Sequence, residues 1–140
     1  MEKLKQRIEE TEHALKTLND IVKEPYSIIV RDAAIQRFEY TFEVFWKTIK
    51  EYLYEHEGIV CNSPKGCFRE ALSVGLMSEE QTITCLEMTD DRNLTSHTYR
   101  EEVADKIYKK IKDYYTLMHT VFEQIKQRTR FYGERDFYQI

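Results

Sequence analysis

The 140-residue sequence is poor in glycine and proline, with four and two residues of these types. An all-β architecture or a flexible interdomain linker needs more of both, so their scarcity disfavours each. No apolar run approaches the roughly 18 residues of a membrane-spanning helix. The first ten residues, MEKLKQRIEE, have neither the apolar core nor the cleavage site of a signal peptide. We therefore expect no membrane association and a cytoplasmic location.

Cysteine is also scarce. Its three residues, Cys61, Cys67 and Cys85, form no CxxC pair, and this spacing disfavours a zinc site. A cytoplasmic protein keeps its cysteines reduced, so we expect three free thiols in or near the core. The sequence also lacks a glycine-rich phosphate loop, the HExxH and GxSxG patterns and an internal repeat.

The formal net charge of -4 excludes a generally cationic nucleic-acid binder. The charge is uneven: residues 1–91 carry 11 basic and 18 acidic side chains, whereas residues 92–140 carry 10 and 7. RNA is therefore a candidate partner only for the C-terminal part. The alternative is that these charges belong to solvated helix faces.

Two long helices are predicted in the first half of the chain from apolar residues that recur three and four positions apart. The first spans residues 2–23 and ends before Pro25; Thr11 fills a gap in its apolar seam. The second spans residues 27–56, ends at Gly58 and is the expected centre of the core. Its apolar series is Ile35, Phe38, Phe42, Phe45, Trp46, Ile49 and Leu53.

Capping signals predict the remaining helices. Ser63 caps a short helix that closes at Gly75. Ser78 begins a helix over residues 78–91 through a capping box with Gln81, with Ile83, Leu86 and Met88 as its apolar residues. Thr98 and Glu101 form a second capping box, which places the start of the last helix near residue 98. The apolar series of that helix is Val103, Ile107, Ile111, Tyr114, Met118, Val121 and Ile125.

These elements predict an all-α, up-and-down bundle of four to five helices over residues 1–128. Residues 129–140 form an aromatic tail that breaks at Gly133 and could dock on the bundle or on a second subunit. Four large aromatic residues lie close together on the second helix, namely Phe38, Phe42, Phe45 and Trp46. We expect a symmetric dimer whose two-fold contact buries some of them.

The stretch RNLTSHTY, at the junction of two predicted helices, contains three chemically useful side chains: Arg92, His97 and Tyr99. An arginine can hold phosphate oxygens, and a histidine exchanges a proton near neutral pH, so the pair suits metal-independent cleavage of RNA. We expect His97 to lie at the positive N-terminus of the last helix. The structural alternative pairs Arg92 with Asp90 or Asp91. The other histidines are expected at surface or boundary positions of helices, namely His13, His56 and His119.

RNLTSHTY resembles the RX4HXY motif of the HepT family, which consists of all-helical proteins of the HEPN superfamily. Residues 31–53 (RDAAIQRFEYTFEVFWKTIKEYL) and residues 63–77 (SPKGCFREALSVGLM) resemble successive segments of the branch known as nucleotidyltransferase substrate-binding proteins. The likeness covers residues 1–128. It implies a homodimeric toxin, a metal-independent ribonuclease, encoded beside a minimal nucleotidyltransferase (MNT) antitoxin.

The resemblance also implies roles for individual residues. Arg92 would hold the scissile phosphate, His97 would be the acid and base, and Asn93 would orient the arginine. Tyr99 would accept AMP from the MNT partner, which alone uses ATP and magnesium; the chain itself needs no cofactor or metal. In the alternative for this branch, the chain is a non-catalytic substrate-binding subunit of a two-chain nucleotidyltransferase.

Overall fold

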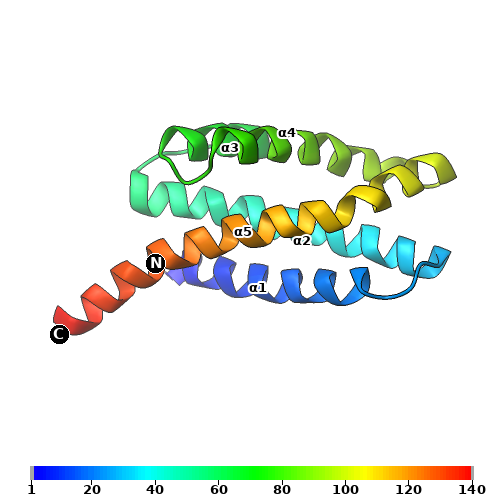
Figure 1. Ribbon diagram of the computed structural model, residues 1–140. Helices are drawn as coiled ribbons and strands as arrows, with labels where there is room; N and C mark the ends of the chain where they lie inside the picture. Colours follow the sequence, from blue (N-terminus) through cyan, green and yellow to red (C-terminus); the bar gives the residue numbers. More distant parts are fainter. Residues whose placement is uncertain (1, 140) are drawn as a thin grey trace.

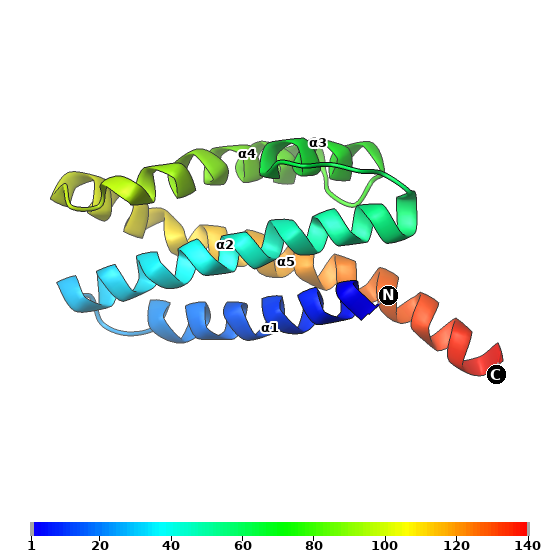
Figure 2. The same ribbon diagram turned by 180° about the vertical axis from the view of Figure 1, so that it is seen from behind.

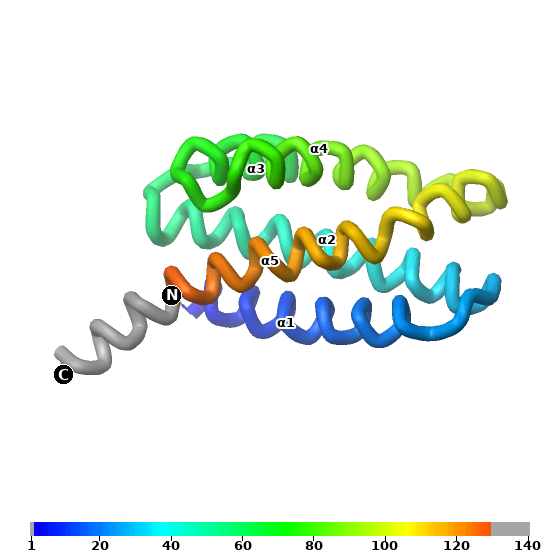
Figure 3. The backbone as a smooth tube through the Cα atoms, viewed as in Figure 1, coloured from blue at the N-terminus to red at the C-terminus, as the bar shows by residue number. Residues whose placement is uncertain are grey.

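The computed structural model describes the backbone of residues 2–139 and the side chains of residues 2–129. Figure 3 draws in grey the residues whose side chains are not described. Within this range the chain is entirely helical, which confirms the predicted fold class. The elements are α1 (Glu2–Val22), α2 (Ile28–Glu57), α3 (Pro64–Ser73), α4 (Glu79–Leu94), the 3-10 helix η1 (Thr95–His97) and α5 (Glu101–Gln139).

The four long helices run up and down along the bundle (Figures 1 and 2). α1 packs on α2 and α5, and the short α3 packs on α2 and α4. Two connections, residues 23–27 and residues 95–100, meet at one end of the bundle, which we call the site end. The opposite end contains the connections 58–63 and 74–78, and we call it the disulfide end.

α2 is the centre of the core, as predicted. Phe38, Phe42, Phe45 and Trp46 are at most 9% exposed within the single chain. The ring of Phe42 meets that of Phe68 on α3 edge to face, with centroids 6.2 Å apart. These aromatic residues therefore leave almost no exposed apolar surface for a second subunit to bury. The argument for a dimer from these residues is wrong, and the dimer itself stays a prediction.

The polar gap in the α1 seam is filled as expected. Thr11 is fully buried, and its Oγ1 lies 2.7 Å from Oγ1 of Thr48 on α2. The Thr48 hydroxyl also bonds the carbonyl oxygens of Arg7 and Val44. Because both hydroxyls are satisfied, two threonines can replace apolar residues at the α1–α2 contact without leaving a buried polar group unpaired.

The apolar series of α5 is confirmed. Its members from Ile107 to Ile125 are buried, and Val103 is half-buried. The series for α4 is partly wrong, because Ile83 is 51% exposed while Thr82 and Cys85 face the core. Thr82 tolerates this position because its hydroxyl donates to the Ser78 carbonyl 2.8 Å away.

The predicted caps in the middle of the chain are present. The Ser63 hydroxyl accepts from the Gly66 amide, and Ser78 and Gln81 form the reciprocal capping box. Gly58 ends α2 in the left-handed conformation, with a φ of 66° that only glycine adopts without strain. These local signals set the bounds of α2, α3 and α4 to within about three residues of the prediction.

The expectation of three free thiols is wrong. Cys61 and Cys67 form a disulfide between the connection 58–63 and α3, with their Cα atoms 5.3 Å apart. Cys85 is the free cysteine of the part the structure describes, and burial raises the pKa of its thiol to about 12. The folding of α3 back onto α2 brings the first two cysteines within bonding distance, which their spacing in sequence does not reveal.

The predicted break at Gly133 is wrong, because α5 continues to Gln139. The docking of the aromatic tail concerns the side chains of residues 130–140, which lie outside those the structure describes. In the described part of the chain, no helix is both long and apolar enough to span a membrane.

Candidate functional site

Arg92 lies in the last turn of α4 and is fixed by Thr95. Its Nη1 donates to Thr95 Oγ1 at 3.0 Å, and the same hydroxyl donates to the Arg92 carbonyl oxygen at 2.6 Å. Thr95 is only 5% exposed, whereas the Arg92 side chain is 26% exposed. The guanidinium is therefore held at one place with part of its surface open to solvent.

The acidic groups that face Arg92 come from α2, not from its neighbours in sequence. Arg92 nitrogens lie 3.9 Å from Glu39 Oε2 and 3.6 Å from Glu43 Oε1. The predicted pairs with Asp90 and Asp91 are wrong. Asp90 instead binds Lys65 at 2.7 Å. Asp91 lies inward and is occupied by α5, as described below, so α4 turns its two aspartates away from Arg92.

Asp91 connects α4 to α5 beneath the site. It is buried, accepts a hydrogen bond from the Tyr114 hydroxyl and lies 3.3 Å from the Lys110 ammonium. Burial, followed by the hydrogen bond to Asp91, raises the pKa of Tyr114. The ring of Tyr114 stacks on Phe38, with centroids 5.7 Å apart. The last turn of α4, which carries Arg92, is thereby fixed against the core.

His97 and Tyr99 both face solvent. His97 ends the 3-10 helix, and residues 98–100 form a turn before α5. Tyr99 is 77% exposed, and its ring meets that of His97 edge to face at 6.0 Å between centroids. Imidazole and phenol groups at an exposed turn are both accessible to a macromolecular substrate or to a modifying enzyme.

The predicted start of the last helix is wrong. α5 begins at Glu101, and Thr98 has a helical backbone conformation and donates its hydroxyl to the Thr95 carbonyl, so no Thr98–Glu101 capping box forms. His97 and Tyr99 therefore precede the helix, and Tyr99 is not in its first turn. The positive end of α5 carries two carboxylates, those of Glu101 and Glu102, which are the charges it favours.

Asn93, the predicted support for Arg92, is exposed in the last turn of α4. Its described contact is through its carbonyl oxygen, which accepts a hydrogen bond from the Ser96 hydroxyl at 3.2 Å. The role assigned to its side chain stays a prediction. The remaining histidines lie in helices at exposed or half-buried positions, as expected: His13, His56 and His119.

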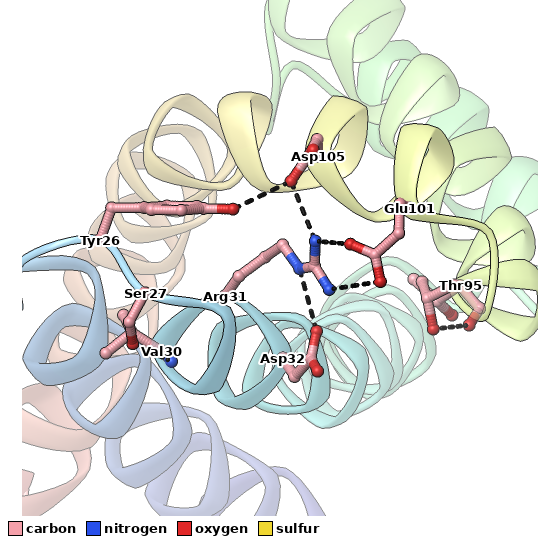
Figure 4. Close-up of polar contacts among 9 residues, drawn as sticks. Tyr26, Ser27, Val30, Arg31, Asp32, Thr95, Glu101 and Asp105 are labelled. Carbon is pink, nitrogen blue, oxygen red and sulfur yellow. Dashed lines mark hydrogen bonds and ion pairs between the residues drawn. The ribbon is translucent and has the colours of Figure 1, made fainter.

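A buried arginine that the sequence reasoning missed lies behind the turn (Figure 4). Arg31, in the first turn of α2, is 2% exposed. Its Nη1 lies 2.6 Å from Glu101 Oε2 and 3.1 Å from Asp105 Oδ1, and its Nε donates to Asp32 at 3.0 Å. Hydrogen bonds to Glu101 and Asp105 raise the pKa of Arg31, so it remains charged. Tyr26 completes the cluster through a 3.1 Å bond to Asp105.

A signal for Arg31 exists in the sequence. It precedes Ala34, Ile35 and Phe38 by three, four and seven residues, which is the spacing of one helix face. A charged residue in the register of a core face must find partners of opposite charge. Among residues 2–129, no group of three or more histidine, cysteine or acidic side chains is arranged to hold a metal ion.

Comparisons with known proteins identify the family of the chain. A model of the family described as nucleotidyltransferase substrate binding protein like matches residues 6–127. The probable ribonuclease HepT of Haemophilus influenzae is 33% identical over 102 residues, which cover 70% of this chain and 68% of the relative. A protein of Thermus thermophilus with a known crystal structure is 48% identical, with a TM-score of 0.80, and the match covers 82% of this chain and 98% of that one.

A more distant likeness extends to toxin complexes. The tri-AMPylated HEPN toxin of Shewanella oneidensis, solved with its MNT antitoxin, has a TM-score of 0.73 at 13% identity, covering 89% of this chain and 96% of that one. This likeness concerns the fold alone, a helical bundle. The family is shown by the closer matches: the chain belongs to the nucleotidyltransferase substrate-binding, HepT-like family, which confirms the resemblance.

Proposed function

We propose that this protein is a HepT-like HEPN toxin, a metal-independent endoribonuclease that acts with a minimal nucleotidyltransferase antitoxin. The observation that carries the proposal is the pairing of an anchored, partly exposed Arg92 with an exposed His97 on one short segment. A relative in the same family is named a probable ribonuclease, which supports the same function.

The proposed chemistry follows from the donor and acceptor capacity of these groups. His97, as a neutral imidazole, takes the proton of a ribose 2′-hydroxyl, and the resulting alkoxide attacks the adjacent phosphorus. Of the hydrogen bonds the structure describes, Arg92 makes one through its side chain, to Thr95, and its buried Nε has no acceptor. A guanidinium has five N–H donors, so Arg92 retains donors for the charge that develops on the phosphoryl oxygens.

The departing 5′-oxygen also needs a proton, and a second histidine in the opposite orientation would supply it. We propose that two copies of the chain bring their site ends together, so that one cleft contains two copies of Arg92 and His97. His97 is exposed in the single chain, which leaves room for such a partner.

Tyr99 is the proposed site of inactivation. Its hydroxyl would attack the α-phosphorus of ATP held by the partner, forming a tyrosyl–AMP phosphodiester and releasing pyrophosphate. The added phosphate would compete with RNA for Arg92, and the adenosine would block the cleft by its bulk. The exposure of Tyr99 and the AMPylated state of the Shewanella toxin support this step.

One observation favours the alternative, a non-catalytic substrate-binding subunit of a two-chain nucleotidyltransferase. Glu39 and Glu43 face Arg92 and repel a phosphate that approaches the guanidinium. In that case Arg92 is structural, and the partner performs all of the chemistry. The family description, which refers to substrate binding, is consistent with this function.

An RNA cleavage assay in the presence of EDTA separates the two functions. The ribonuclease proposal predicts cleavage by the purified protein and a loss of about 100-fold or more in Arg92→Ala and His97→Ala. Matched controls are Arg69→Ala and His119→Ala, which remove exposed side chains of the same types on α3 and α5. Intact RNA combined with tight binding of the partner transferase would support the alternative.

Mass spectrometry tests the modification. Incubation with the partner transferase, ATP and magnesium should add one or more AMP units to the wild type. Tyr99→Phe should lose the modification and retain cleavage. Tyr54→Phe is the control, because Tyr54 is also strongly exposed, at 61%, but lies on α2 near the disulfide end. If Tyr99→Phe is modified as readily as the wild type, Tyr99 is not the acceptor.

A further inference from the structure

The turn that carries His97 and Tyr99 is held at both of its ends. At its start, Thr95 is buried and bonded to both the side chain and the carbonyl oxygen of Arg92. At its end, Glu101 accepts hydrogen bonds from Arg31, with Nη1 2.6 Å from one carboxylate oxygen and Nη2 3.5 Å from the other. Five residues, 96–100, lie between these two contacts.

No other described hydrogen bond ties residues 96–100 to a distant part of the bundle. The described hydrogen bonds within it are local: the Arg100 amide bonds the His97 carbonyl at 3.1 Å, and the Arg100 carbonyl accepts from Val103 and Ala104. Local bonds of this kind give the turn its shape but do not attach it to the rest of the bundle. The attachment comes from Thr95 on one side and from Glu101 on the other.

We infer that Arg31 is a positioning residue of the site: by holding Glu101, it sets where His97 and Tyr99 lie relative to Arg92. The inference rests on the proposed function, which gives that position its importance. Arg31 touches neither His97 nor Tyr99 in any described contact; it acts through the first turn of α5, some 70 residues away in sequence.

The form of the contact suits positioning better than stability. The guanidinium of Arg31 is buried, although its partner Glu101 stays exposed, and a buried charge is costly to desolvate, so an apolar residue of similar size often stabilises a core more. A guanidinium fork that meets one carboxylate through both nitrogens is directional, and it fixes the first turn of α5 more narrowly than apolar packing does. Asp105, one turn further along α5, accepts from the same Nη1 at 3.1 Å, so Arg31 contacts α5 at two successive turns.

Two adjacent glutamates provide a matched test. Glu101 and Glu102 are both in the first turn of α5, and their side chains are 67% and 68% exposed. Glu101 binds Arg31, whereas the described ion pair of Glu102 is local, with its neighbour Arg100 at 2.9 Å. Glu101→Ala and Glu102→Ala therefore remove the same charge from the same helix end, but only the first removes the contact with Arg31.

The experiment measures RNA cleavage and amide hydrogen exchange of the wild-type protein and of three variants, Glu101→Ala, Glu102→Ala and Glu101→Gln. We expect Glu101→Ala to lower kcat about tenfold with little change in KM, because His97 is misplaced while binding groups remain. Amide exchange in residues 97–100 should become about tenfold faster. Glu102→Ala should match the wild type in kcat and in the exchange of residues 97–99; Arg100 is left out of this comparison because Glu102 binds its side chain. Glu101→Gln, which keeps acceptor oxygen on the side chain, should recover part of the loss.

Two results would overturn the inference: unchanged exchange of residues 97–100 in Glu101→Ala, or faster exchange with unaltered kcat. A general loss of structure is distinguished by exchange in the α1–α2 contact, which should stay at the wild-type rate. If the wild type does not cleave RNA at all, the proposed function fails, and the exchange comparison of Glu101→Ala with Glu102→Ala still decides whether Arg31 holds the turn.

Discussion

The two ends of the bundle are closed by different means. At the disulfide end, Cys61 is bonded to Cys67, and Leu76 and Met77 are each 2% exposed. At the site end, the turn 95–100 is attached through Thr95 and through Arg31, which binds Glu101. One end therefore relies on a covalent bond and apolar burial, and the other on directional polar contacts.

This difference shows how a small bundle can display reactive side chains without losing its fold. Apolar burial is strong but requires the residues that close an end to face inward. Polar contacts fix the backbone of a turn while its other side chains stay in solvent, as His97 and Tyr99 do. The site end can consequently be altered at its exposed residues with little effect on stability.

The largest expected effect is the loss of apolar closure at the disulfide end. Leu76→Ala should reduce the free energy of unfolding by about 2–5 kcal/mol, because it leaves a cavity at a fully enclosed position. Tyr99→Ala, at the site end, should change it by less than about 0.5 kcal/mol. Urea unfolding followed by circular dichroism measures both. Similar losses in the two variants would contradict the difference between the ends.

The next effect is that of the disulfide. Reduction should lower the free energy of unfolding by about 2 kcal/mol, as expected for a bond that closes a loop with a sequence separation of six. Urea unfolding with and without a phosphine reductant tests this. A Cys61→Ser, Cys67→Ser variant is the control and should not respond to the reductant. A wild type that does not respond either would show that the bond contributes nothing to this end.

A smaller effect is expected beneath the site. Tyr114→Phe removes the hydroxyl donor to buried Asp91 and should cost about 1.5 kcal/mol, while the stacking on Phe38 is retained. Tyr115→Phe is the matched control, because the next residue along α5 stacks on His119 instead. Thermal unfolding of the two variants compares them directly. Equal melting temperatures would mean that the α4–α5 polar contact does not stabilise the site end.

The smallest expected effect is the loss of stability at low pH that comes from Asp105 at the site end. The hydrogen bond from Arg31 holds the pKa of Asp105 below its ordinary value of 3.8. Because that pKa is depressed in the folded state, the ionised carboxylate of Asp105 adds to the free energy of unfolding. This contribution is fully present above pH 3.8 and is lost as the pH falls through the pKa of the folded state. Carboxyl carbon NMR should show the depressed titration. In Arg31→Met the titration should move up towards 3.8, while Glu102→Gln should leave it in place. If the titration of Asp105 does not move in Arg31→Met, Arg31 is not the cause of the depressed pKa.

Much of the bundle could be predicted because its signals are local. The spacing of apolar residues on α2 and α5, the Ser78–Gln81 box and the stop at Gly58 depend on residues a few positions apart. The capping box at Thr98 failed for a reason outside that range. Its acidic member, Glu101, instead forms an ion pair with buried Arg31, whose charge requires a partner.

The sequence by itself determined which segments are helical, which faces of α2 and α5 are apolar and which motif joins α4 to α5, because helix periodicity and capping act over a few residues. Only the tertiary structure decided the partners across the bundle: Glu39 and Glu43 for Arg92, Glu101 for Arg31, and the bond between Cys61 and Cys67. Such pairs depend on how helices are placed side by side, and spacing along one helix carries no information about the register of its neighbour.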